Sequence, residues 1–113
     1  MIEHLNLARN RLESLPRSIS NLSKLADIDL SGNNLTDNSV QQEEGQSEIE
    51  FAKSLKVINL SQNNFTRIPA FAYRIETVEL KQNQITDWNL EPSIDYSLMK
   101  VRNLDVSGNA ELE

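Results

Sequence analysis

The residues of this chain that could do acid–base or metal chemistry are few and scattered. His4 is the only histidine among 113 residues, and there is no cysteine. No acid and nucleophile accompany His4 in the sequence, so a surface contact explains it better than catalysis does. Asp87, Glu91 and Asp95 are irregularly spaced and lack the pattern of a calcium loop. We therefore predict that the chain is not an enzyme, has no metal site and uses no cofactor.

One polar residue type does recur at a fixed spacing. An asparagine follows a pair of alternating apolar residues in five places, as Asn10 follows Leu5 and Leu7. The five are Asn10, Asn33, Asn63, Asn83 and Asn109. A side-chain amide both donates and accepts hydrogen bonds, so it can satisfy backbone groups of a buried bend, each of which would otherwise cost about 1–3 kcal/mol. We predict that the five asparagines form a buried ladder with a structural role.

The asparagines belong to a longer repeated segment. Each copy starts with an apolar residue, and the further apolar positions and the asparagine follow at constant offsets. The copies start at Ile2, Leu25, Leu55, Ile75 and Val101. The fifth copy departs from the pattern at its last position, where Glu111 stands. Within a copy, Leu5 and Leu7 are two residues apart, so they point to one face of a short strand and leave Asn6 on the other.

This pattern resembles the leucine-rich repeat family, whose segment is LxxLxLxxNxL, and the matches cover nearly the whole chain. The resemblance implies an α/β solenoid with a curved parallel sheet on its concave side and loops and short helices on its convex side. Stacking of neighbouring copies agrees with this, because one strand cannot bury its apolar face alone. We predict a single domain over residues 1–113. Neither end shows a capping element, so we expect this chain to be a segment of a longer receptor, scaffold or signalling protein.

The convex side is expected to vary between copies. The second copy carries an insertion of residues 37–54 with five acids and one base. We expect a mobile loop over Asp37–Gln46 and a short helix over Glu48–Ser54, which a capping-box pattern precedes. An acidic docking loop is one interpretation, although a solvated insertion explains the charges better. In the short third copy we expect almost no convex helix and a core filled by Phe65, Ile68 and Phe71.

The concave sheet face is the predicted partner-binding surface. Its side chains at the outward strand positions are Asn6, Asp27, Asp29, Asn59, Thr77, Glu79, Asn103 and Asp105. Acids and amides dominate this set, so a basic or amide-rich protein or peptide is the better match. A net charge of −6 disfavours nucleic acid, and no apolar run approaches the roughly 20 residues of a membrane span.

Three classes of function remain open. The first is a protein–protein interaction module, expected in the cytoplasm because the start of the sequence lacks the pattern of a signal peptide. The second is the ligand-recognition segment of a receptor ectodomain, which four Asn-x-Ser/Thr triplets would favour. The third is a structural spacer within a larger signalling protein.

Overall fold

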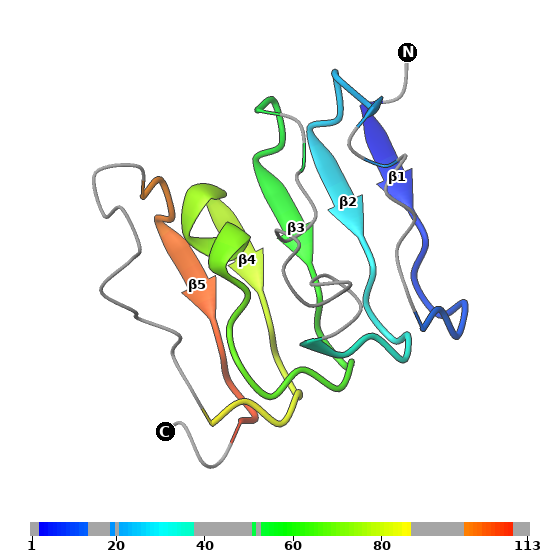
Figure 1. Ribbon diagram of the computed structural model, residues 1–113, viewed down its shortest axis with the longest axis vertical. Coiled ribbons are helices and arrows are strands. Elements are labelled where there is room, and N and C mark those ends of the chain that lie inside the picture. The colour runs from blue at the N-terminus through cyan, green and yellow to red at the C-terminus, as the bar shows by residue number, and fades with distance from the viewer. Residues whose placement is uncertain are drawn as a thin grey trace, which may run out of the picture.

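The computed structural model describes residues 3–13, 19, 21–37, 51, 53–86 and 99–109. Its strands are β1 (His4–Asn6), β2 (Asp27–Asp29), β3 (Val57–Asn59), β4 (Thr77–Glu79) and β5 (Asn103–Asp105). They form one parallel sheet in chain order, β1-β2-β3-β4-β5 (Figure 1). The chain therefore adds one strand per copy of the repeat, as a solenoid does. The predicted parallel-sheet architecture is confirmed.

The register of the sheet is the register of the sequence repeat. Leu5 lies opposite Ile28, Ile28 opposite Ile58, and Val78 opposite Leu104. These central strand residues point into the core, and Ile58 in the middle strand is fully buried. Equivalent residues of successive copies thus stack on one another, which builds a continuous core from very short strands.

The core is tightest in the middle of the sheet. Leu30, Leu60 and Leu80, which directly follow β2, β3 and β4, are completely buried. Leu5 and Leu104 in the two outer strands are only partly buried. An outer strand has a neighbouring strand on one side only, so its apolar side chains are less completely buried. Full burial of a Leu or Ile side chain stabilises the fold by about 1.5–3 kcal/mol, and partial burial contributes less. The middle copies therefore contribute most of the apolar stabilisation.

The third copy does contain a convex helix, contrary to the expectation of almost none. This is η2, a 3₁₀ helix over Ala70–Arg74 that starts after Pro69. A 3₁₀ helix rises about 2.0 Å per residue, more than an α-helix, so it spans the convex side of a short copy with few residues. Phe71 is buried as predicted, and its ring meets that of Phe51 edge to face at a centroid distance of 5.0 Å. Phe65 and Ile68 are fully buried, also as predicted.

Most of the insertion in the second copy lies outside the described residues, including nearly all of the predicted loop and four of the seven residues of the predicted helix. Its first residue is nevertheless anchored, because Asp37 accepts hydrogen bonds from the backbone N of Thr66 at 3.1 Å and of Arg67 at 3.3 Å. The assignment of Asp37 to a mobile loop was therefore wrong. Ser54, predicted as the last helical residue, lies in a turn and donates its hydroxyl to the backbone oxygen of Leu25 at 2.7 Å.

No helix in the described part of the chain has the length and apolar character needed to cross a membrane.

Candidate partner-binding face

Four of the five predicted ladder asparagines are buried, with exposed fractions of 1–7%: Asn33, Asn63, Asn83 and Asn109. Asn63 shows the pattern of their contacts. Its Nδ2 donates to the backbone oxygen of Leu30 in the preceding copy and of Leu60 in its own, each at 3.0 Å. Its Oδ1 accepts from the backbone N of Leu35 at 3.0 Å. Each buried amide thus connects the bend that follows its own strand to the equivalent bend of the preceding copy.

Asn10 does not belong to the buried ladder, so that part of the prediction was wrong. Its side chain is exposed, and its Nδ2 donates to the backbone oxygen of Ala8 at 3.2 Å. The reason is the direction of the ladder. Each amide contacts the preceding copy, and none precedes Asn10 in the described chain. Asn10 instead donates its backbone N to Oδ1 of Asn33 at 2.9 Å.

The residue before each ladder position has a left-handed backbone. The five φ values are 59° at Arg9, 68° at Gly32, 58° at Gln62, 55° at Gln82 and 80° at Gly108. This conformation costs an L-residue about 1–2 kcal/mol, which glycine avoids. The glycines also leave room for a neighbour, because a Cβ on Gly108 would lie 2.9 Å from Cγ of Gln82. Sequence reasoning missed this position, although Gly32 and Gly108 share it.

The last residue of most strands fixes the turn that follows. The side-chain oxygen of Asn6, Asp29, Asn59 and Asp105 accepts, in each case, the backbone N–H two residues later at 3.0 Å. Where that later residue is Ser31 or Ser107, its hydroxyl also donates to the same carboxylate at 2.6 Å. Short Asn and Asp side chains make such turns because they reach their own nearby backbone. These predicted partner-binding residues therefore also hold the edge of the sheet, a role that the Asp-x-Ser spacing indicates.

The fourth copy replaces this turn with contacts between copies. Glu79 stands where the other strands end in Asn or Asp, and the N–H two residues later belongs to Lys81. The hydroxyl oxygen of Ser61 in the third copy accepts that N–H at 3.0 Å. The Glu79 carboxylate instead lies 3.6 Å from Nζ of Lys81, which is also 3.7 Å from the Asp105 carboxylate. Lys81 therefore sits between two predicted site acids, and sequence reasoning did not identify it.

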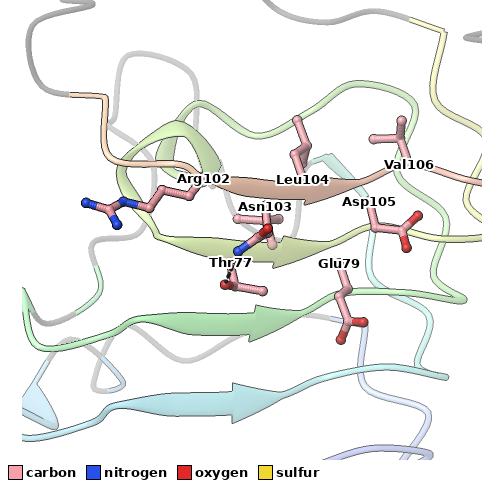
Figure 2. A pocket seen from close by; sticks show the side chains of 8 residues that line it. Thr77, Glu79, Arg102, Asn103, Leu104, Asp105 and Val106 are labelled. Carbon is pink, nitrogen blue, oxygen red and sulfur yellow. Dashed lines mark hydrogen bonds between the residues drawn. The ribbon is translucent and has the colours of Figure 1, made fainter.

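Four predicted site residues line one hollow of about 490 Å³ across β4 and β5: Thr77, Glu79, Asn103 and Asp105. Figure 2 shows the Glu79 and Asp105 carboxylates at the same end of the two strands, with Arg102 at the other end of β5. Nδ2 of Asn103 donates to Oγ1 of Thr77 at 3.4 Å, the bond drawn dashed in Figure 2. The hollow thus presents acids at the ends of β4 and β5 and hydroxyl and amide groups at the starts of these strands.

Hydrogen bonding also shapes the electrostatics of the face. The hydroxyl and the backbone N–H of Ser107 bond to the Asp105 carboxylate, and with the nearby Lys81 ammonium they lower the pKa of Asp105 below its ordinary value. Asp105 is thus held in its charged form more firmly than an isolated surface aspartate.

The remaining predicted residues lie toward the start of the sheet. Asp27 of β2 pairs with Nδ1 of His4 on β1. An acid partner for His4 could not be predicted from the sequence, because Asp27 lies 23 residues away, in the next copy of the repeat. Val57 of β3 lies opposite both Asp27 and Thr77, and it is the one large apolar side chain among the described residues that is exposed, at 37%. We call the outward surface of β1–β5 the concave face; Val57 lies in its middle strand.

Two family models match the chain. A model described as Leucine Rich Repeat matches residues 1–22 and 54–73, and a second, described as Leucine Rich repeat, matches residues 21–41. The matches together include β1, β2 and β3 and extend over more than half of the chain.

Proposed function

Because the chain belongs to the leucine-rich repeat family, we propose that it is an interaction module that binds a partner protein or peptide on its concave face. Leucine-rich repeats typically act as non-enzymatic interaction modules. The observation that carries the proposal is the in-register array of outward side chains over five parallel strands, with an exposed apolar residue, Val57, in the middle strand. An apolar side chain surrounded by polar groups is the arrangement found at the centre of many interfaces.

The chemistry of the face favours a basic or amide-rich partner segment. Asp29, Glu79 and Asp105 place three carboxylates along the strand ends, and Lys81 balances one of them. Asn59 lies opposite Asp29 on one side and Glu79 on the other, and Asn103 is on the same strand as Asp105, so both add amide groups to the face. An Arg or Lys side chain of a partner would find carboxylate acceptors here, and charge-assisted hydrogen bonds are stronger than neutral ones.

The size of the face sets the strength of binding. Strands about 4.8 Å apart make a five-stranded face roughly 19 Å wide. A stable interface buries about 800 Å² per partner, more than a face of this width and a few residues' length provides. We therefore expect weak, fast-dissociating binding by this part of the chain alone.

Peptide selection from a random display library on the full chain tests the proposal. Enriched peptides would be labelled and titrated by fluorescence anisotropy against the original chain and two variants. Val57→Lys adds bulk and positive charge at the centre of the face and should weaken binding at least about tenfold, or about 1.4 kcal/mol. The exposed Thr86, outside the strands, provides the control Thr86→Lys, which should change affinity less than about twofold. Equal losses, or a larger loss with Thr86→Lys, would place the site elsewhere.

A second candidate, recognition within a receptor ectodomain, has one observation in its favour. Three asparagines in glycosylation triplets, Asn21, Asn34 and Asn64, are exposed. The fourth, Asn59, is on the concave face and uses its side-chain oxygen to accept the Ser61 N–H. The intact mass of protein from a secretory host, with site mapping, tests this candidate. Glycans on the exposed Asn21, Asn34 and Asn64 would favour it, whereas a glycan on Asn59 would cover the proposed binding face.

A further inference from the structure

A second hollow, of about 610 Å³, lies beside the strand starts of β3–β5 and has the opposite charge to the strand ends. It is lined by Lys53, Lys56, Arg74, Lys100 and Arg102, with Glu76, Leu55, Met99 and Val101. Five Lys and Arg side chains thus gather here, and Glu76 is the one acid among the described residues that line the hollow. We call this the basic hollow.

The fold brings these cations together from distant parts of the sequence. Lys56 and Arg102 directly precede β3 and β5, and Arg74 ends η2. Because the strands are parallel, all of their starts lie at one edge of the sheet, and Figure 2 shows Arg102 and Asp105 at opposite ends of β5. The backbone N of Lys100 donates to the oxygen of Tyr73 at 2.8 Å, which fixes the approach to β5 beside η2.

The five cations are available to a partner. All five are exposed, and within the described part of the chain no carboxylate lies at ion-pair distance from any of them. Like charges that line one hollow repel one another, so the cluster weakens the fold unless an anion neutralises it. At physiological salt the screening length is about 8 Å, so this local charge outweighs the net charge of −6 for a group inside the hollow.

We propose that the basic hollow binds an acidic peptide segment of a partner protein, at a surface distinct from the acidic strand ends. The cations are spread over three segments rather than aimed at one point, which suits several carboxylates spaced along a chain better than one phosphate. The partly exposed Met99 and Val101 add apolar contact area that a bare anion would not use. A membrane surface fits less well, because the same sheet carries acids at its other end.

A labelled ten-residue peptide rich in Glu, titrated by fluorescence anisotropy against the full chain, tests the proposal. The triple variant Lys53→Gln, Lys56→Gln and Lys100→Gln should weaken binding about tenfold, because each surface ion pair contributes a factor of roughly 1.5 to 5. The matched control removes three exposed cations outside the hollow, by Arg9→Gln, Arg11→Gln and Lys24→Gln, and should change affinity less than about twofold. The affinity of the peptide for the original chain should fall several-fold between about 50 and 200 mM salt, because added salt screens the attraction between the cations and the peptide carboxylates.

Three further readings decide the meaning of the result. The triple variant should melt at the same temperature as the original chain or higher, because it relieves repulsion; a clear drop would show that the cations serve the fold and would overturn the proposal. Equal binding by the triple variant and its control would do the same. Tighter binding of a neutral peptide with one phosphoserine, or of anionic lipid vesicles, would replace the acidic peptide with that ligand. Loss of peptide binding here would leave the Val57→Lys result unaffected, so the two proposals fail separately.

Discussion

Asn63 and Asn10 occupy the same position of the repeat, yet only Asn63 is buried. The difference lies in what each amide contacts. Asn63 donates to a backbone oxygen of the preceding copy, whereas Asn10 donates to the backbone oxygen of Ala8 in its own copy. The repeat pattern shows that both asparagines occupy the ladder position, but it does not show whether each is buried. Burial depends on whether another copy lies beside the asparagine. At the residue scale, position in the stack decides the energetic weight of an asparagine.

Replacing Asn63 with Ala should therefore destabilise the chain by at least about 2 kcal/mol, because several buried backbone groups lose their partner. The matched change Asn10→Ala should cost less than about 0.5 kcal/mol, as expected for an exposed position. Urea unfolding monitored by circular dichroism would measure both. Similar midpoint shifts for the two variants would be inconsistent with a ladder that acts through burial.

Asp105 makes a prediction about pH. Its pKa is lowered in the folded chain by the Ser107 hydrogen bonds and by Lys81, so the unfolded chain binds more protons in the acid range. Stability from this group is present above the ordinary aspartate pKa, near pH 4, and is lost as the pH falls through the lower folded-state pKa. Asp105→Asn keeps an oxygen for the Ser107 N–H but does not titrate, so its stability should fall less between pH 5 and pH 2.5. Unfolding curves with the same pH slope as the original chain would contradict this assignment.

At the scale of elements, the turn after β2, β3 and β5 is a unit with three parts: an Asx oxygen, a left-handed residue and a buried ladder amide. The strands themselves could be predicted from sequence because their alternation has a period of two and recurs in every copy. The contacts between turns could not, since they join residues 20 or more positions apart, as Lys81 N–H joins Ser61. The 3₁₀ helix η2 was missed for a related reason: its five residues are too few to show a helical period.

The left-handed position provides the test at this scale. Gly32→Ala should cost about 1–2 kcal/mol, because a side chain at φ 68° is strained. Gln62→Gly, the opposite exchange at the equivalent position, should change stability by less than about 0.5 kcal/mol, since relief of strain is offset by a more flexible unfolded chain. Thermal or urea unfolding checks the pair. A stabilising Gly32→Ala would show that the left-handed backbone is not required there.

At the scale of the whole molecule, the sheet is polarised along its strands. Carboxylates gather at the strand ends, around Glu79 and Asp105, and cations gather at the starts of β3–β5. The residues on the concave face could be named from the sequence, because the outward positions follow from the alternation. The basic hollow could not, because its cations come from residues 53 to 102 and meet only when the copies stack.

The most direct test of the concave face as the binding surface removes its charge without removing its turns. The variant Asp29→Asn, Glu79→Gln and Asp105→Asn keeps the oxygens that accept the Ser31 and Ser107 N–H groups, so it should fold normally. Its matched control, Glu43→Gln, Glu44→Gln and Glu48→Gln, removes three acids from the sequence insertion instead. Fluorescence anisotropy with the library-selected peptides should show at least about a tenfold loss of affinity for the concave variant and less than about a twofold change for the control. Retention of the peptides by the concave variant, with loss by the control, would contradict the account and assign binding to the acidic insertion.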